Sequence, residues 1–586
     1  MPEQKIKITP AKGRPMLYWV GKRPLDYVRG FPAQLIEVFD PLNTGRKVYT
    51  PIYDELKDNW QNLLFHGDNK EVLATLLELG FRGKIDLIYI DPPFKSGADY
   101  VRKVELRGLK NLGRIDEDSA SVLQQTMYFD IWNNDNYLQF MYERLMLLRE
   151  LLSETGSIYV HLDWHVGHYV KLLMDDVFGQ ENFRNEIVWC YTGPSNQEKD
   201  FPDKHDVIYR YSKSDKYTSN FDKIRIPYAK LETGKTHGIF KQEATLSEKG
   251  KIPEDWWADI TPVARLHATE LLNFQTQKPE KLLERIIKAS SNPSDLILDC
   301  FIGSGTTAAV AQKLGRRWIG CDINKGAVQL TSSRLQKIIK EHIENNETKY
   351  PYFAIYKVNN YDLKLLQTEA IELAVQHIGI QRTRTDRFFD GTLGNNLVKI
   401  IDFNHPLTLL DLQLLQDELK KRPNEDRDIV IVCLGKELAV DQWIDEWNKK
   451  PTINKIKVIE LKTDKKYGSF LIHKPAEAKI KIEHTDKNKA VVEIQDFISP
   501  TIIERLNIDN NLFKVKVPDF RSMIDCVLID TNYDDNTFHI AYSDVPENKN
   551  DLIRGRYEIE IPKKETKIAI KIIDMLGEEI LVVKEI

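Results

Sequence analysis

The residues with the most distinctive chemistry in this sequence are Asp91-Pro92-Pro93-Phe94. They follow the apolar run 85–90, which has the length of a buried strand, and two consecutive prolines stop that strand in one stiff, extended conformation. The turn can hold the Asp91 carboxylate and the Pro92 carbonyl as two acceptors for the hydrogens of a neutral –NH2 group, while Phe94 offers its ring face. Such a site suits the exocyclic amine of a nucleobase taken out of its stack. The alternative is a surface turn that the prolines only punctuate, and these four residues alone do not decide between the two.

The segments around this turn alternate between strand and helix patterns. The sequence predicts strands at 63–65, 157–163 and 186–191, and core-facing helices around 72–77, 136–152 and 168–178. This alternation is typical of an α/β fold with a Rossmann-like, doubly wound mixed sheet. Ligands bind at the carboxyl ends of the strands in such sheets, so we expect Asp91 and Phe94 at the ligand edge. Asp68 either caps the helix around 72–77 or lies at the same edge.

A second motif, at residues 294–324, joins a strand, a glycine turn, a helix and another strand. The first strand ends in Asp299, the turn contains Gly303 and Gly305, and the second strand ends in Asp322. Glycines let a ligand approach the backbone, the helix start offers free N–H groups, and an acid about 20 residues on can accept two ribose hydroxyls. The motif therefore predicts an adenosine-type ligand. It does not predict a phosphate-loop nucleotide site, because no Gly-Lys-Ser/Thr follows the turn.

Two further segments have compositions that suit contacts with nucleic acid. The segment after Phe94 is basic and includes Lys95, Arg102, Lys103, Arg107 and Lys110. Such a loop can contact phosphates beside a pocket for a base, although a solvated basic loop needs no partner. Residues 192–267 are polar and interleave basic with aromatic side chains. This stretch is too long for a simple connection and predicts an inserted, functional region.

Size and composition restrict the classes of protein that remain. A chain of 586 residues is expected to form roughly two to four domains, and a net charge of −5 confines nucleic-acid contacts to local patches. The five cysteines show neither metal-ligand nor disulfide spacing, so we expect reduced thiols in a cytoplasmic protein and no metal site. The sequence contains no signal-peptide core and no apolar run of membrane-spanning length.

Taken together, DPPF at 91–94 and FIGSGTT at 301–307 resemble the paired signatures of S-adenosylmethionine-dependent amino-methyltransferases that act on DNA. Their order, with the catalytic motif first and the cofactor motif last, resembles the beta arrangement of this family and its type III modification subunits. HGDN at 66–69, GSIYVHLD at 156–163 and TQKP at 276–279 resemble further elements of the family. The resemblance covers roughly residues 60–335 and implies a methyltransferase fold with a target-recognition region at 192–267.

The resemblance also implies roles for individual residues. Asp91, Pro92, Pro93 and Phe94 would hold the flipped target base. The S-adenosylmethionine site would have Asp68 toward the adenine and Asp322 on the ribose hydroxyls. The rest of that site would comprise Lys278, Pro279, Asp299, Phe301, Gly303, Ser304, Gly305 and Thr306. DNA contacts would come from Lys95, Arg102, Lys103, Arg107 and Lys110. Lys95 departs from the polar uncharged residue common in type III relatives, and Asp322 from their frequent Glu.

The expected function is methylation of adenine N6 in double-stranded DNA, within a prokaryotic restriction-modification or phage-defence system. Asp in the first position of DPPF favours adenine, whereas Ser there would favour cytosine N4. The alternatives are cytosine N4 methylation, methylation of RNA or of a protein amide, and a non-catalytic DNA-specificity subunit. Besides DNA, the expected partners are a restriction or helicase subunit and a second copy of this chain, with a location in the cytoplasm at the nucleoid.

The expected domains follow the motifs along the chain. Residues 1–50 form an N-terminal arm, 51–191 the catalytic half, 192–267 the target-recognition insertion and 268–345 the cofactor-binding half. The resemblance ends near residue 345, and residues 346–586 are expected to form an α/β piece followed by a strand-rich module of unknown role.

Overall fold

The computed structural model forms two compact units, residues 1–359 with 476–586, and residues 360–475. The structure describes residues 5–11, 17–19, 21–42, 50–93, 100–107, 122–128, 134–191, 199–227, 249–263, 276–347, 349–358, 371, 374–375, 378–382, 386, 388–401, 406–451, 454–461, 476–486, 488–503, 519–546, 551–562 and 566–585.

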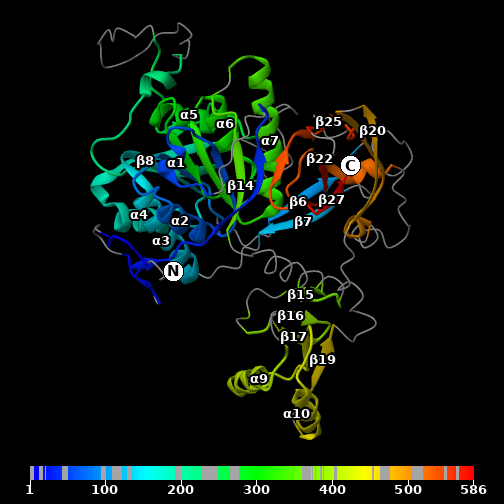
Figure 1. The fold of residues 1–586 in the computed structure, drawn as a ribbon. Helices are drawn as coiled ribbons and strands as arrows, with labels where there is room; N and C mark the ends of the chain where they lie inside the picture. Colours follow the sequence, from blue (N-terminus) through cyan, green and yellow to red (C-terminus); the bar gives the residue numbers. More distant parts are fainter. Residues whose placement is uncertain are drawn as a thin grey trace. The chain divides into compact units, whose positions relative to one another are not determined.

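The first unit is built on a mixed sheet of eleven strands (Figure 1). In spatial order these are β11 (Trp256–Trp257), β9 (Phe183–Cys190), β10 (His205–Ser212), β8 (Leu152–Leu162), β5 (Ile85–Ile90), β12 (Leu296–Asp299), β13 (Arg317–Asp322), β4 (Asn62–His66), β14 (Phe353–Val358), β3 (Ala33–Phe39) and β23 (Phe538–Ile540). The six strands from β8 to β14 are parallel, whereas β10 and β3 run antiparallel to their inner neighbours. The predicted α/β class with a doubly wound mixed sheet is confirmed.

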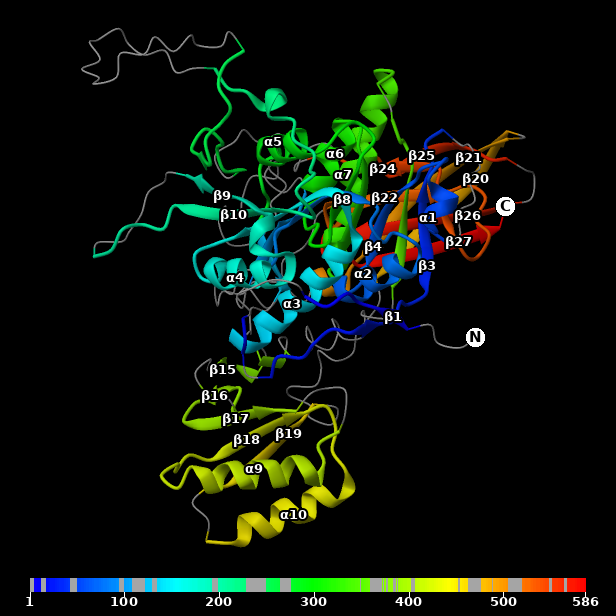
Figure 2. The ribbon, with the colours of Figure 1, turned by 90° about the vertical axis from the view of Figure 1, so that its left-hand side faces the viewer.

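Helices cover both faces of this sheet (Figures 1 and 2). One face packs against α2 (Asn69–Glu78), α3 (Asn134–Leu151) and α4 (Gly167–Phe178). The other packs against α5 (Glu280–Ser290), α6 (Thr306–Lys313) and α7 (Lys325–Glu344). Side chains along β5 point alternately to the two faces of the sheet. Ile88 and Ile90 pack in the core under α2, α3 and α4, whereas Leu87 and Tyr89 pack in the core under α5, α6 and α7.

The connections around β5 and β12 create the ligand edge that the sequence predicts. The chain leaves β5 through α3 toward β8, and it leaves β12 through α6 toward β13, on the opposite side. The two strands are direct neighbours, with Leu87 paired to Ile297. A crevice opens outside the carboxyl ends of two strands whose connections diverge in this way. Asp91 and Asp299 therefore lie at the switch point of the sheet.

Two segments contribute more to the sheet than their sequences indicate. β3 belongs to the segment predicted as an arm, and β10 belongs to the segment predicted as an insertion. Within β10, Arg210 is buried and packs over the rings of Tyr159, Tyr217 and Phe221. Part of the basic and aromatic interleaving in 192–267 thus serves the fold rather than a ligand.

The C-terminal strands of the first unit form two smaller sheets. One contains β20 (Glu477–Asp486), β21 (Lys489–Ile498) and β25 (Arg556–Glu560), and the other contains β24 (Tyr542–Asp544), β22 (Ile524–Asp530), β26 (Lys567–Asp574) and β27 (Glu579–Glu585). β23 joins the main sheet beside β3, and a buried ion pair of 2.8 Å connects Lys571 Nζ on β26 to Glu37 Oε2 on β3. Residues 476–586 therefore share a core with the main sheet, whereas 360–475 form the separate unit.

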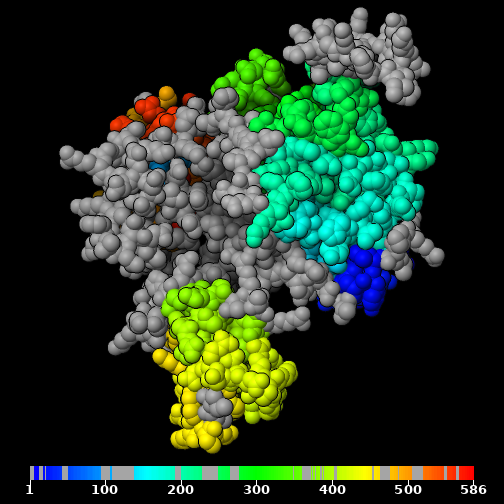
Figure 3. Space-filling model, turned by 180° about the vertical axis from the view of Figure 1, so that it is seen from behind, coloured from blue at the N-terminus to red at the C-terminus, as the bar shows by residue number. Residues whose placement is uncertain are grey.

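The first unit also contains short elements at its periphery. These are β1 (Ile6–Lys7), β2 (Tyr27–Val28), α1 (Tyr53–Leu56), the hairpin β6 (Tyr100–Glu105) and β7 (Val122–Tyr128), and the 3-10 turns Gln180–Asn182, Phe221–Ile224 and Phe520–Met523. In the space-filling view, the cyan residues around α4 and the green residues around α5 form one continuous surface (Figure 3).

The second unit is a small α/β fold with five strands. They are β15 (Gln381–Arg382), β16 (Gly391–Leu393), β17 (Asn396–Ile400), β18 (Ile429–Cys433) and β19 (Ile456–Glu460), accompanied by α9 (Leu409–Lys421) and α10 (Leu438–Lys449). The order β18, α10 and β19 alternates strand, helix and strand, as in an α/β piece. Across the described part of both units, no helix is long and apolar enough to cross a membrane. No His, Cys, Asp and Glu side chains gather there as metal ligands.

Candidate active site

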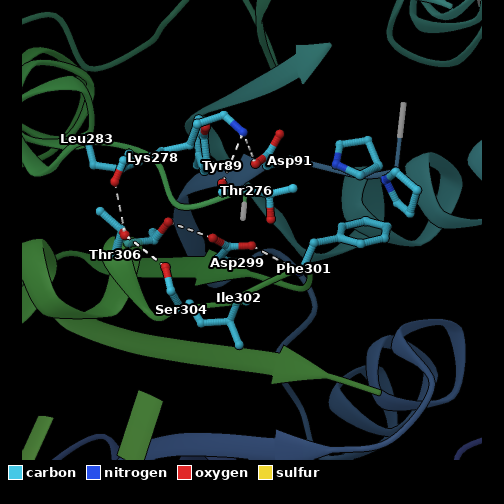
Figure 4. Close-up of a pocket in the computed structure, with 14 residues that line it drawn as sticks. Tyr89, Asp91, Thr276, Lys278, Leu283, Asp299, Phe301, Ile302, Ser304 and Thr306 are labelled. Carbon is cyan, nitrogen blue, oxygen red and sulfur yellow. Dashed lines mark hydrogen bonds and ion pairs between the residues drawn. The ribbon is translucent and has the colours of Figure 1, made fainter. Parts of the chain in front are cut away.

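The carboxylate of Asp91 lies where β5 ends and the two prolines begin (Figure 4). Its Oδ2 forms an ion pair with Lys278 Nζ, which comes from the segment just before α5. Its Oδ1 is buried and has no hydrogen-bond partner among the residues that the structure describes. A buried carboxylate oxygen without a donor is costly, so this atom is suited to receive one from a ligand.

Two acidic side chains, Asp299 and Asp322, accept hydrogen bonds that hold the glycine turn in place. Asp299 accepts hydrogen bonds from the backbone N–H of Phe301 at 2.9 Å and from Thr307 Oγ1 at 2.5 Å. Asp322 Oδ2 accepts the N–H of Gly303 at 2.9 Å. Gly305 precedes α6 with φ of +77°, and a Cβ there would lie 2.7 Å from Thr331 Oγ1. Both the left-handed backbone and the lack of space require glycine at this position.

Burial shapes the electrostatics of this turn. It raises the pKa of Asp299 to about 7, against the opposing hydrogen bonds from Thr307 and Phe301, and the charges of Asp91 and Asp322 add to the rise. Near neutral pH, Asp299 is therefore partly protonated. The ammonium of Lys278 pairs with Asp91, and both Asp91 and Asp299 line the cavity.

One cavity joins the two motifs that the sequence singles out. It is lined by Tyr89, Asp91, Pro92, Pro93, Thr276, Lys278, Leu283, Asp299, Phe301, Ile302, Gly303, Ser304, Thr306 and Thr307 (Figure 4). Apolar side chains, an ammonium, carboxylates and an open glycine backbone meet here. This set fits a ligand that carries a carboxylate, an ammonium and an apolar ring, so the residues present suit an adenosyl amino acid.

The structure brings most of the predicted cofactor residues to this cavity, but not all of them. Of the residues that the structure describes, Asp68, Pro279, Gly305 and Asp322 are not among those that line it. Asp68 caps α2 by accepting the N–H of Lys70 at 2.8 Å, and Arg144 Nη2 lies 3.1 Å from its Oδ2. The capping role that the sequence offered for Asp68 is therefore present, and its contact with the adenine stays a prediction.

The predicted DNA-binding residues are only partly described. Phe94, Lys95 and Lys110 lie outside the described residues, and only the backbone of Arg102 and Lys103 is described, in β6. Arg107 is largely buried, and its Nη2 forms an ion pair of 2.7 Å with Asp525 at the start of β22. Its neighbour Leu106 packs in the core of the C-terminal strands. In this structure Arg107 ties the end of β6 to that core, and its contact with phosphate stays a prediction.

Sequence reasoning missed a buried hydrogen-bonded chain beside the cavity. Tyr89 Oη lies 2.8 Å from His161 Nδ1, and His161 Nε2 lies 3.0 Å from Asp206 Oδ2. Tyr191 Oη donates to the other oxygen of Asp206 at 3.1 Å. The side chains come from β5, β8 and β10, and Tyr191 follows directly after β9. Polar residues inside apolar strands are the only sequence signal for such a chain, and they do not reveal its partners.

Comparison with known proteins assigns these motifs to one family. Residues 85–333 match the N6_N4_Mtase family model, described as DNA methylase. The chain is 32% identical to the type II methyltransferase M1.MboII of Moraxella bovis over 250 residues, which covers 41% of this chain and 85% of that protein. It is 31% identical to the type III restriction-modification enzyme EcoPI Mod subunit of Escherichia phage P1, covering 60% of this chain and 72% of that one.

A third relative is the DNA adenine methyltransferase YhdJ of Escherichia coli (strain K12). It is 29% identical over 282 residues, which covers 47% of this chain and 83% of that protein. The matched family region contains both the Asp91 turn and the glycine turn, and the geometry joins the two in one cavity. The chain therefore belongs to the N6/N4 DNA methylase family and is an S-adenosylmethionine-dependent DNA methyltransferase.

Proposed function

We propose that this enzyme methylates the N6 amine of adenine in double-stranded DNA, with the target base flipped out of the helix. The observation that carries the proposal is the buried, unpartnered Oδ1 of Asp91 at the wall of the cavity shared with the glycine turn. A base inside a duplex cannot reach such an atom, because both its faces are stacked. The target nucleotide must therefore leave the stack to present its amine here.

The chemistry follows from the weakness of the nucleophile. The lone pair of an exocyclic amine is delocalised into the ring, so the amine attacks poorly. Asp91 Oδ1 and the Pro92 carbonyl accept its two N–H bonds and draw the nitrogen toward tetrahedral geometry, which localises the lone pair. S-adenosylmethionine, when bound, supplies the electrophilic methyl group. The nitrogen gains a methyl carbon and loses one proton, for which Asp91 Oδ1 is the positioned acceptor. Positioning and electrostatics carry the catalysis.

The choice of adenine rests on the residue at the start of the turn. Asp91 occupies the position where Asp favours adenine over cytosine, and one relative is named as a DNA adenine methyltransferase. Modification-aware single-molecule sequencing of DNA from an expressing host reports both the modified base and its sequence context. We expect N6-methyladenine in one short sequence, and N4-methylcytosine there would overturn the choice of base.

The role of Asp91 has its own test. Replacing Asp91 with Ala removes the acceptor but leaves the glycine turn unchanged. We expect the variant to bind S-adenosylmethionine in calorimetry and to transfer no tritiated methyl group to DNA above background. Undiminished transfer by the Asp91→Ala protein would refute the mechanism.

We further propose that the enzyme is the modification subunit of a restriction-modification system in the cytoplasm, at the nucleoid. A relative is named as the Mod subunit of a type III restriction-modification enzyme, and its similarity spans 474 aligned residues. In this proposal residues 51–191 and 268–345 form the catalytic and cofactor halves, 192–267 recognise the target, and 346–586 include the docking surface for a restriction or helicase subunit. Copurification with a restriction subunit tests the partner, and light scattering tests for a homodimer.

A further inference from the structure

The contacts of Lys278 connect the two halves of the site. Its backbone carbonyl accepts a hydrogen bond from Thr306 Oγ1 at 3.2 Å, at the first residue of α6. Arg334 Nη1 also donates to Thr306 Oγ1, at 3.1 Å. The Lys278 side chain then reaches the opposite wall, where its ammonium binds Asp91 Oδ2 (Figure 4). The backbone of Lys278 is thus held beside the glycine turn, while its ammonium group lies at Asp91, where β5 ends.

We propose that Lys278 is a positioning residue that orients Asp91 toward the target amine. The ammonium occupies Oδ2, so the carboxylate can present only Oδ1 to a ligand. This inference rests on the proposed function, because it assumes that Asp91 accepts a hydrogen bond from the amine. It assigns Lys278 to the base side of the reaction, whereas the sequence resemblance implies a place in the S-adenosylmethionine site.

The physical reason is that a buried carboxylate needs a counter-charge to stay a fixed acceptor. Both side chains are largely buried, with 10% of Lys278 and 14% of Asp91 exposed. Without the ammonium, neither oxygen of the carboxylate would be held in place, and a largely buried charge would be left without its counter-charge. Loss of Lys278 should therefore act on the methyl-transfer step.

The test uses the full-length enzyme with single and double variants. Lys278→Met removes the charge with little change in length, and Lys278→Arg keeps it. Lys288→Met is the matched control, because Lys288 lies on the helix that follows Lys278 but pairs with Glu284 on that helix, with both side chains partly exposed. Each variant is also combined with Asp91→Asn. Single-turnover methyl transfer at saturating DNA and cofactor is measured beside the cofactor Kd from calorimetry.

We expect Lys278→Met to lower the single-turnover rate by about 10- to 100-fold, the effect of losing one charge-assisted contact. The cofactor Kd should change less than about 3-fold, Lys278→Arg should recover most of the rate, and Lys288→Met should resemble the unmodified enzyme. In the Asp91→Asn background, Lys278→Met should cause almost no further loss, because two residues that act through one contact are not additive.

Two results would overturn the proposal. One is a cofactor Kd that Lys278→Met raises at least about 10-fold while the rate at saturation stays normal, which would make Lys278 a cofactor ligand. The other is an additive loss in the Asp91→Asn background, which would separate Lys278 from Asp91. If Lys278→Met does not fold, Lys278→Gln keeps a donor for Oδ2 without the charge and takes its place. A fully active Asp91→Asn protein would instead refute the proposed function itself, whatever Lys278 does.

Discussion

The buried hydrogen bonds from Tyr89 to Asp206 should stabilise strand β5, and Tyr89→Phe tests this directly. Burial raises the pKa of Tyr89 far above its ordinary value, so its hydroxyl stays protonated. Burial opposes ionisation of Asp206, yet hydrogen bonds from His161 and Tyr191 and the charge of Lys278 hold its pKa below the ordinary value. An ionised Asp206 accepts Nε2–H of His161, so Nδ1 is left to accept the Tyr89 hydroxyl.

The expected magnitude follows from what Tyr89→Phe leaves behind. His161 is fully buried, so water does not replace the lost 2.8 Å hydrogen bond from Tyr89 Oη. Loss of a buried hydrogen bond of this kind costs about 1–3 kcal/mol in the free energy of unfolding. Because Tyr89 lines the cavity two residues before Asp91, the rate of methyl transfer should also fall, by about 3-fold or more.

The assay is urea unfolding of full-length protein, with Tyr191→Phe as the matched control. Tyr191 donates to the same Asp206 but is only partly buried, so water can replace its hydroxyl, and the loss should stay below about 1 kcal/mol. If the two variants lose equal, small amounts of unfolding free energy, the chain contributes no more than an ordinary surface contact. The hydroxyl of Tyr89 would then not stabilise strand β5.

Three further predictions concern other parts of the first unit. Glu37→Ala should lower the free energy of unfolding by about 3–5 kcal/mol, because it leaves the Lys571 charge buried, and a Glu37→Leu/Lys571→Met pair should recover most of this loss in urea unfolding. Burial raises the pKa of Asp574 to about 7, so the unfolded chain ionises first. Stability should then fall by up to about 4 kcal/mol between pH 4 and 7, and Asp574→Asn should flatten this slope. Gly305→Ala should cost about 1–3 kcal/mol in stability and weaken cofactor binding in calorimetry, and unchanged values would contradict the strain assigned to its positive φ.

The local structure of the site could be predicted from the sequence because its signals are local. The strand before Asp91 is continuous apolar sequence stopped by two prolines, and the structure has β5 end there. The glycine turn lies between an acid-terminated strand and a helix, and the structure places β12, Gly303, Gly305 and α6 in that order. Periodicity and turn chemistry depend only on neighbouring residues.

The contacts across the site could not be predicted in the same way. Lys278 and Asp91 meet although 187 positions separate them, and His161 meets Asp206 across 45 positions. Strand β10 falls within the predicted insertion because polar residues such as Asp206 and Arg210 are typical of a surface segment. In the structure both are buried, where Asp206 pairs with His161 and Arg210 packs over the ring of Tyr159, both on β8. Burial of a polar side chain depends on such distant partners, and a single sequence does not show them.

The topology explains why the catalytic motif can precede the cofactor motif by so many residues. β5 and β12 are hydrogen-bonded neighbours, so their carboxyl ends coincide whatever the chain does between them. That intervening chain builds β8, β9 and β10 on one side of β5 and then returns to β12. Residues between these outer strands can vary with the DNA target without displacing Asp91 from Asp299. The hydrogen bonds that join Tyr89, His161 and Asp206 are the exception, because they cross from β10 to β5. Substitutions at Asp206 should therefore shift the position of Asp91.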